Sequence, residues 1–274
     1  MAEKRISIGA RSSELAKKQA EMFVNETGLK AHIIKAITTK GDIDKRPLHE
    51  IGEGIFTKEI DKALLNGEID LAVHSLKDIP VEGFHKDLEI AFVFGRQDAR
   101  DCMVGRLGVV GTDSIRRQYE MKSISNNVTF KPLRGNIGTR ISKIESKEYD
   151  GIIAAKCALD RLGLSNKISR IFSIDDMVPA AGQGAIAVVK RKKDKFSFLK
   201  KNKLYYCCML ERGFIRGLGG CKKPVGAFCE SRNNKFYLTG VLYSGQKRIF
   251  KKFNGKREEI ARAIKEWKKH WIRK

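Results

Sequence analysis

One stretch organises this chain: Ile69-Asp70-Leu71-Ala72-Val73-His74-Ser75-Leu76-Lys77-Asp78-Ile79-Pro80. Its first half is a mostly apolar run of the length of a buried strand. Pro80 cannot donate a backbone hydrogen bond and disfavours helix at Ile79, so regular structure is expected to stop there. Lys77 and Asp78 then lie at the carboxyl end of a strand, where open α/β sheets bind ligands. An inert surface ion pair is the ordinary interpretation of such a dipeptide, so the rest of the sequence must decide.

Strand and helix patterns alternate around this stretch. The sequence predicts strands at residues 5–10, 31–38, 71–74, 89–94, 109–110, 151–154 and 185–189. It predicts helices from a cap at Ser12 or Ser13 to Gly28, at 56–66, after residues 112–114, after residue 138 and up to residue 163. Residues 39–54 are expected to form a mobile loop. This β-α-β order predicts parallel sheets with helices on both faces.

Six arginines recur near the ends of these predicted elements. They are Arg11, Arg116, Arg117, Arg134, Arg140 and Arg161. All except Arg161 lie at strand-to-helix junctions, which converge on one cleft in a doubly wound sheet. Guanidinium forks bind carboxylates or phosphates through two parallel hydrogen bonds, and helix N-termini attract anions. The sequence therefore predicts a cleft that binds a polyanion.

The positive charge of the chain is concentrated at its C-terminal end. The net charge is +23 over 274 residues, a length that suits two or three domains. Residues 190–274 hold 26 basic and 6 acidic residues. A basic region raises the question of nucleic-acid binding, but no zinc-finger spacing or aromatic RNA-binding signature accompanies it. A solvated lysine-rich surface is the favoured interpretation.

The six cysteines and five histidines show no metal-site spacing. No C-x-x-C or H-x-x-x-H pair occurs, so no metal is expected. The sequence also shows no secretory signal and no membrane-spanning run, which favours a cytoplasmic protein with reduced thiols. Cys221 is distinctive because it follows Gly219-Gly220 and precedes Lys222-Lys223. It is a candidate nucleophile or attachment point, although a lone cysteine is more often a small buried hydrophobe.

Six blocks closely resemble the porphobilinogen deaminase family, also called hydroxymethylbilane synthase. In the family's order, they are Ile8–Ala16, Ala72–Pro80, Gly111–Gln118, Leu133–Arg140, Ala180–Ala185 and Glu211–Gly226. The resemblance implies an α/β fold with two doubly wound domains like periplasmic binding proteins, plus a small α+β C-terminal domain. The implied domains are residues 1–95 with 183–200, residues 96–182, and residues 201–274, in a monomer.

The resemblance also implies the chemistry. Four porphobilinogen units are joined head to tail with loss of ammonia, and hydroxymethylbilane is released for tetrapyrrole (haem) biosynthesis. The primer is a dipyrromethane cofactor, which a thioether attaches to Cys221. Asp78 matches the catalytic aspartate, which protonates the leaving amine and stabilises positive charge on a pyrrole nitrogen.

The matched blocks assign the remaining site residues. The implied cofactor-binding residues besides Cys221 are Lys77, Thr112, Ser114, Arg116 and Arg117. The implied substrate-binding residues are Arg11, Ser13, Gln19, Arg134, Arg140 and Arg161. Gln183 lies in a matched block near the domain crossing, and its role stays open.

Two departures and two alternatives accompany this interpretation. The loop Gly52–Phe56 is one residue shorter than is usual in the family and lacks its lysine. Asp113 stands where the family often has serine, so it is not counted as a ligand. A two-lobed anion-binding receptor without catalysis would explain the arginines but not Cys221 or Asp78. A nucleic-acid binder would explain only residues 190–274, so neither a specific nucleic acid nor a membrane is an expected partner.

Overall fold

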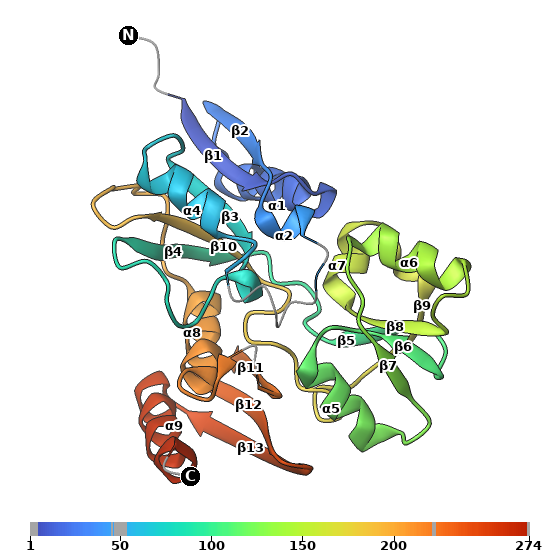
Figure 1. The fold of residues 1–274 in the computed structure, drawn as a ribbon. Coiled ribbons are helices and arrows are strands. Elements are labelled where there is room, and N and C mark those ends of the chain that lie inside the picture. The colour runs from blue at the N-terminus through green and yellow to red at the C-terminus, as the bar shows by residue number, and fades with distance from the viewer. Residues whose placement is uncertain (1–4, 45, 47–53, 221–222, 273–274) are drawn as a thin grey trace.

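The structure is a computed structural model that describes residues 5–44, 46, 54–220 and 223–272. Three sheets lie in three separate parts of the molecule (Figure 1). Two sheets have five strands and mixed strand directions, and the third is a small antiparallel sheet near the C-terminus. The predicted fold class, two α/β units with a small α+β unit, is confirmed.

The first sheet is mixed rather than wholly parallel. Across the sheet its strands are β2 (His32–Ile37), β1 (Ile6–Arg11), β3 (Leu71–Ser75), β10 (Ile186–Arg191) and β4 (Leu88–Phe94). β10 runs antiparallel to both neighbours, so the prediction of a parallel sheet is wrong for this strand. The reason is that β10 enters the sheet at the carboxyl end of β3, where Ile186 pairs with Ser75.

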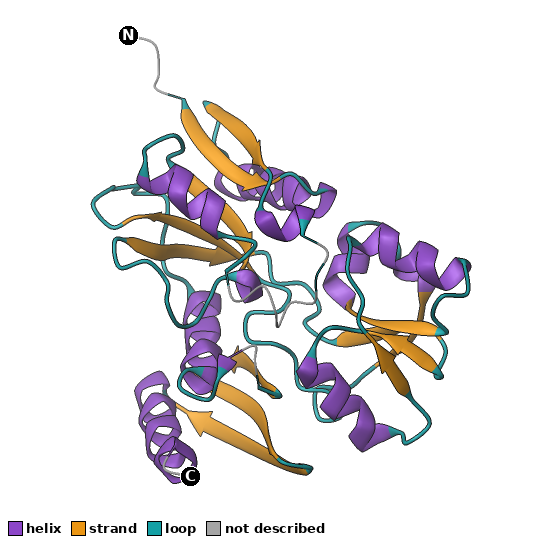
Figure 2. Ribbon diagram, viewed as in Figure 1, coloured by secondary structure: helices purple, strands orange, loops and turns teal. Residues whose placement is uncertain are grey.

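Helices cover both faces of this sheet (Figure 2). Alternate residues of β10 point to opposite faces: Ile186 packs with α1 (Glu14–Thr27), and Ala187 with α4 (Lys58–Leu65). Ser13 caps α1, and Gly28 ends it in the left-handed conformation at φ 64°, as the sequence predicts. The expected loop at 39–54 instead begins with a short helix, α2 (Lys40–Ile43), and its residues 45 and 47–53 lie outside the described residues.

The second sheet has the same layered build. Across it lie β7 (Thr129–Lys131), β6 (Val109–Gly111), β8 (Gly151–Ala155), β5 (Asp101–Gly105) and β9 (Ile168–Ile171). Its helices are α5 (Ile115–Ile124), α6 (Ile137–Glu145) and α7 (Lys156–Arg161), with a 3-10 turn η2 (Ser165–Lys167) before β9. The sequence analysis missed β5 and β9. β9 is an exposed edge strand and therefore lacks the apolar run that marks a buried one.

The C-terminal sheet packs against two helices. Its strands are β11 (Val225–Arg232), β12 (Lys235–Ser244) and β13 (Lys247–Gly255), and its helices are α8 (Lys203–Ile215) and α9 (Arg257–Ile272). The alternating sequence of residues 236–242 and 247–253 predicts the hairpin of β12 and β13, and the amphipathic stretch 258–271 predicts α9; both are confirmed. Trp267 stacks on Phe214 with ring centroids 5.2 Å apart. The sequence analysis missed α8, which is buried on opposite sides: Cys208 packs under the first sheet and Phe214 against the C-terminal sheet.

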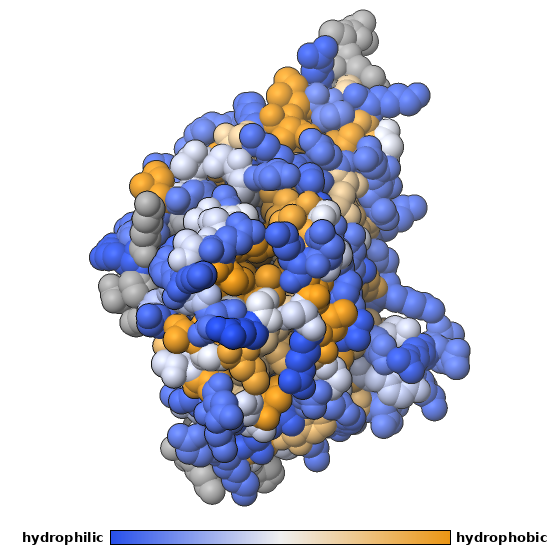
Figure 3. Space-filling view, turned by 90° about the vertical axis from the view of Figure 1, so that its right-hand side faces the viewer, coloured by the Kyte–Doolittle hydropathy of each residue, from blue (hydrophilic) through white to orange (hydrophobic). Residues whose placement is uncertain are grey.

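The surface is strongly polar. Hydrophilic residues cover most of the face drawn in Figure 3. Among the described residues, no helix is long and apolar enough to span a bilayer.

Candidate functional site

The turn that carries Lys77 and Asp78 is the 3-10 turn η1 (Leu76–Asp78), which directly follows β3. The amide of Leu76 donates to the carbonyl of Ala185 at 3.0 Å, beside β10. Gly182 lies against the Leu76 side chain at φ +79°, and a Cβ there would come within 2.6 Å of Leu76 Cγ. Only glycine therefore fits at position 182 beside the buried Leu76 side chain. Leu76 holds the turn against the segment that precedes β10.

A small cavity of about 80 Å³ lies beside this turn. Five predicted site residues line it, namely Arg11, Ser13, Gln19, Lys77 and Asp78. Arg11 Nη1 is 4.0 Å from Asp78 Oδ2, and Arg11 Nη2 is 2.5 Å from Asp42 Oδ1. The Arg11 guanidinium also stacks over Phe56, 4.1 Å from the ring centroid. The structure thus brings the candidate catalytic carboxylate together with an arginine from the neighbouring strand.

Several uncharged polar residues also line or border the cavity. Gln19 Nε2 donates to Ser75 Oγ at 2.9 Å, and Ser13 Oγ accepts from the amide of Ala16 as the cap of α1. His74 also lines the cavity, where burial and then the Arg11 charge lower its pKa to about 4. His74 is therefore neutral at physiological pH, and the charges at this cavity come from Arg11, Lys77 and Asp78.

A chain of buried polar contacts leads from the turn to the second sheet. Lys77 Nζ donates to Gln183 Oε1 at 3.3 Å, and Gln183 Nε2 donates to Asp101 Oδ1 at 2.8 Å. Burial lowers the pKa of Lys77; the Arg117 charge adds to this shift, and the Asp78 charge opposes it. Gln183, whose role the sequence left open, therefore bridges the two α/β units.

Asp101 is the functional-site residue that sequence reasoning missed. It is fully buried and pairs with Arg116 Nη2 at 2.8 Å and with Arg117 Nη2 at 2.7 Å. Burial alone would raise the pKa of Asp101, but the two guanidiniums outweigh it and hold the pKa at about 2. Asp101 lies close to the predicted boundary between the first two domains, at residues 95 and 96, and no sequence pattern marks it as a site residue. The only signal was the arginine pair Arg116 and Arg117.

Arg116 and Arg117 thus belong to a buried network, in which both guanidinium groups already have protein partners. Besides Asp101, Arg116 donates to the carbonyl of Val178 at 2.7 Å, and Arg117 to that of Ile153 at 2.9 Å. Both follow the N-cap Ser114, which accepts from the amide of Arg117. Thr112 Oγ1 in turn accepts from the amide of Ser114 at 3.2 Å. Four of the predicted cofactor-binding residues therefore form one connected cluster at the start of α5, namely Thr112, Ser114, Arg116 and Arg117.

Arg134 reaches from the second unit to the first. Its Nη2 donates to the carbonyls of Gly41 at 3.3 Å and Asp44 at 3.1 Å. Its guanidinium lies 5.7 Å from the Phe56 ring centroid, on the ring that Arg11 also contacts. Arg134 and Arg11 therefore converge on one aromatic side chain from opposite units.

Arg140 carries a positive charge with little compensation. Its Nε donates to the carbonyl of Gly135 at 2.8 Å. Burial, followed by the charges of Arg117 and Arg134, lowers the pKa of Arg140 to about 10, although Asp113 and Asp78 oppose the shift. Asp113 also has a structural task, because its Oδ1 accepts from the amide of Leu133 at 3.0 Å.

Arg161 lies away from the small cavity. Its Nη2 donates to the carbonyls of Gly95 at 2.9 Å and Gly184 at 2.6 Å. Gly95 follows β4 and Gly184 precedes β10, so Arg161 joins the two segments that cross between the units. This is consistent with its position outside the strand-to-helix junctions.

The site has cationic groups that the described residues do not satisfy. The Nε atoms of Arg11, Arg134 and Arg161 are buried and have no hydrogen-bond partner there. The pKa values of Lys77 and Arg140 are lowered by burial and by neighbouring positive charge. Burying unpaired charge is unfavourable, so the arrangement fits a ligand with several carboxylates. Cys221, the predicted attachment residue, lies outside the described residues.

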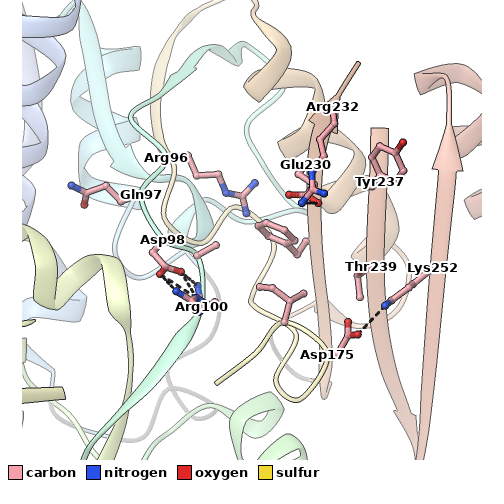
Figure 4. Close-up of a pocket in the computed structure, with 13 residues that line it drawn as sticks. Arg96, Gln97, Asp98, Arg100, Asp175, Glu230, Arg232, Tyr237, Thr239 and Lys252 are labelled. Carbon is pink, nitrogen blue, oxygen red and sulfur yellow. Dashed lines mark hydrogen bonds and ion pairs between the residues drawn. The ribbon is translucent and has the colours of Figure 1, made fainter. Parts of the chain in front are cut away.

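A larger cavity of about 580 Å³ lies elsewhere, between residues 96–100 and the C-terminal sheet (Figure 4). None of the predicted site residues lines it. Its charges are largely matched: Arg100 pairs with Asp98 at 2.6 Å, and Lys252 with Asp175 at 2.9 Å. We therefore place the candidate active site at the smaller cavity. Among the described residues, no group of three or more His, Cys, Asp or Glu side chains could hold a metal ion.

Comparisons with known proteins find relatives over most of the chain. Residues 6–198 match the family described as "Porphobilinogen deaminase, dipyromethane cofactor binding domain", and residues 205–267 match "Porphobilinogen deaminase, C-terminal domain". The chain is 38% identical to the porphobilinogen deaminase of Alkaliphilus metalliredigens, with 89% of this chain and 84% of that protein covered. For the porphobilinogen deaminase of Helicobacter acinonychis the identity is also 38%, with 96% and 93% covered.

Similar solved structures include the periplasmic aliphatic sulphonate binding protein SsuA from Escherichia coli. That similarity has a TM-score of 0.40 at 10% identity, and it covers 77% of this chain and 68% of SsuA.

Proposed function

Because this chain belongs to the porphobilinogen deaminase family, a family of transferases, we propose that Asp78 is its catalytic residue. The proposed reaction joins four porphobilinogen units head to tail, with loss of ammonia from each, and releases hydroxymethylbilane. The observation that carries this assignment is the position of Asp78. It lies on a turn that Leu76 holds against Gly182 and Ala185, beside a cavity that Arg11 and Lys77 also line. The comparisons do not favour the receptor-like alternative.

Asp78 can act on the substrate in two ways. The carbon–nitrogen bond of porphobilinogen breaks, its electron pair stays on nitrogen, and the carboxyl group of Asp78 supplies the proton with which ammonia leaves. The resulting carboxylate then stabilises the positive charge that develops on the pyrrole nitrogen. A carbon–carbon bond forms to a neighbouring pyrrole ring, and that ring loses a proton. Arg11 Nη1 lies 4.0 Å from Asp78 Oδ2, so a guanidinium stands beside the carboxyl group at the cavity.

The arginines supply binding and orientation. When bound, the dipyrromethane cofactor supplies the pyrrole carbon to which the first substrate is joined. We propose that Lys77, Thr112, Ser114, Arg116 and Arg117 hold its carboxylates, with Cys221 as the point of attachment. Substrate carboxylates would contact Arg11, Ser13, Gln19, Arg134, Arg140 and Arg161. The buried arginine Nε atoms without partners support this assignment, because carboxylate oxygens satisfy such donors.

The domain boundaries that the sequence predicts are part of the proposal. We propose one domain from residues 1–95 with 183–200, a second from 96–182 and a third from 201–274. The separate apolar clusters of the three sheets support this division. α8 of the third domain also packs under the first sheet, so these two domains share a core. We further propose a cytoplasmic monomer that acts on porphobilinogen and binds no specific nucleic acid.

The test is the substitution Asp78→Asn, which keeps the shape of the side chain and removes its proton chemistry. We expect a folded protein whose kcat falls by about 10²- to 10⁴-fold, the usual contribution of general acid–base catalysis. Asp87→Asn is the control, because Asp87 is an exposed carboxylate of the same unit. Product formation and intact mass are measured for both variants. An Asp78→Asn enzyme within a few-fold of the wild-type kcat would remove Asp78 from the mechanism.

A further inference from the structure

The chain that leaves the Asp78 turn is held by a helix of the C-terminal unit. Arg212 of α8 donates from Nη1 to the carbonyl of Ile79 at 2.8 Å and from Nη2 to the carbonyl of Pro80 at 2.7 Å. The Arg212 residue is only 4% exposed. Ile79 and Pro80 belong to no strand or helix, so no regular backbone ladder fixes these two carbonyls.

The residue before Arg212 secures the other side of the same turn. Glu211 is fully buried, and its Oε2 accepts from the amide of Gly182 at 2.6 Å. Gly182 is the glycine against which Leu76 packs. The other oxygen of Glu211 accepts from Arg96 at 2.6 Å and from the amide of Cys229 at 2.7 Å. Successive residues of α8 therefore contact the segment after Asp78 and the glycine against which Leu76 packs.

Two further contacts bind the same segment to this unit. Val81 packs into the apolar cluster that α8 shares with the C-terminal sheet. Glu82 Oε1 accepts from the amide of Gly217, just beyond the end of α8, at 2.7 Å. Residues 79–82 are therefore docked on α8 through polar and apolar contacts, and Arg212 is the contact closest in sequence to Asp78.

We infer that Arg212 is a positioning residue for the reaction: it fixes the direction in which the Asp78 carboxylate faces the cavity. The inference rests on the proposed function of Asp78. A guanidinium is planar and rigid, so two of its donors set two adjacent carbonyls at once. Displacing a catalytic group by about 1 Å can cost on the order of 10²-fold in rate, so a loosened Ile79–Pro80 segment is expected to slow turnover.

The location of Arg212 gives this role a further consequence. α8 ends at Ile215, and the sequence runs through Gly219-Gly220 to Cys221. One helix therefore contacts the Asp78 turn and leads into the proposed attachment residue. Through Arg212, the catalytic turn is tied to the unit that carries the primer rather than to its own sheet alone.

The experiment compares Arg212→Gln and Arg212→Lys with Arg216→Gln. Arg216 follows the last residue of α8 and its side chain is exposed, so it is a matched control. We expect Arg212→Gln to lower kcat by about 10- to 100-fold while KM changes by less than about threefold, because the substrate-binding arginines are untouched. Arg212→Lys should recover part of kcat, and Arg216→Gln should behave as wild type. Wild-type kcat in Arg212→Gln would overturn the inference.

Chemical rescue separates positioning from loss of fold. In Arg212→Ala, guanidinium ion at tens of millimolar is expected to restore part of kcat, whereas equal urea or sodium chloride should not. If lost activity follows lost folded protein by circular dichroism in all the Arg212 variants, without rescue, Arg212 is merely structural. If Asp78→Asn is inactive while every Arg212 variant is fully active, this inference fails and the proposed function stands. If Asp78→Asn is active, the proposed function itself fails.

Discussion

At the scale of single residues, Asp101 links the two arginines at the start of α5 to the turn that carries Asp78. It accepts hydrogen bonds from Arg117 and Gln183 and forms an ion pair with Arg116 while fully buried. A buried carboxylate survives only with such partners, and removing one side of a buried ion pair is strongly destabilising. Asp101 is therefore expected to support both the stability of the protein and the orientation of the arginines.

This role predicts a specific dependence of stability on pH. The two neighbouring guanidiniums hold the folded-state pKa of Asp101 at about 2, below the ordinary aspartate value of 3.8. A lowered pKa adds stability that is complete above the unfolded value and is lost as pH falls through the folded value. Asp101→Asn should therefore lower the unfolding free energy by about 3–5 kcal/mol at pH 7. Between about pH 4 and pH 2 the unfolding free energy of the wild type should fall toward that of the Asp101→Asn variant.

Thermal and urea unfolding across pH 2–8 measure this difference. The matched control is Asp98→Asn, because Asp98 lies in the same segment but its pair with Arg100 is partly exposed. A partly exposed pair contributes little, about 0–1 kcal/mol. Two results would contradict the buried network. One is an equal loss of unfolding free energy in Asp98→Asn and Asp101→Asn. The other is a difference in unfolding free energy between Asp101→Asn and wild type that is unchanged at pH 2.

At the scale of helices and strands, the first turns of α5 and α6 carry three of the arginines proposed to bind carboxylates. Arg140 lies in the first turns of α6, and its positive charge is poorly compensated. We expect Arg140→Leu to raise KM or to stall elongation, which mass spectrometry would show as protein species one pyrrole unit apart. Because the substitution removes a partly buried positive charge that neighbouring arginines repel, thermal stability should not fall. Loss of stability with unchanged KM would contradict the assignment.

The control for Arg140 is the basic C-terminal region. Lys192, Lys193, Lys251 and Lys269 are exposed, and salt screens such charges within about 8 Å at physiological ionic strength. Their replacement by glutamine should barely change KM. Lys268 is left out because its Nζ donates to the carbonyls of Gly213 and Arg216, and so supports the end of α8. If the lysine variant stalls and Arg140→Leu does not, the basic region is the polyanion site.

The elements differ in how well the sequence predicts them. The spacing of apolar residues predicts α1, and its ends follow from the capping residues Ser13 and Gly28. β9 was missed because it is an exposed edge strand without a buried face. α8 was missed because the first sheet and the C-terminal sheet bury opposite sides of it, which removes the polar stripe of a surface helix. Local patterns therefore fail where burial is set by distant parts of the chain.

The same limit applies to the candidate site. The sequence places Arg11, Lys77 and Asp78 at strand ends, and the structure brings them to one cavity. It does not reveal that Asp101 binds Arg117, because these partners meet only through sheet packing. Nor does it reveal that Arg161 contacts the crossing segments at Gly95 and Gly184. The residues at a strand-to-helix junction can be predicted from the local sequence. The partner of a long side chain depends on the whole fold and cannot.

At the scale of the whole molecule, the C-terminal unit holds both α/β units in place. Arg212 contacts the chain after Asp78, and Arg248 pairs with the buried Glu120 of α5 at 2.9 Å. Any change in the spacing of the two α/β units must therefore also be accommodated at these contacts. The turn that carries Asp78 is therefore held by two units and not by its own sheet alone.

The most direct test of the central claim is the intact mass of the purified protein. Wild-type protein is expected to exceed its sequence mass by two covalently attached pyrrole units. Cys221→Ser should have only its sequence mass and no activity, and Cys229→Ser, which alters a buried cysteine of β11, should keep the added mass. Wild-type protein without added mass, or Cys221→Ser protein that retains it, would contradict the account.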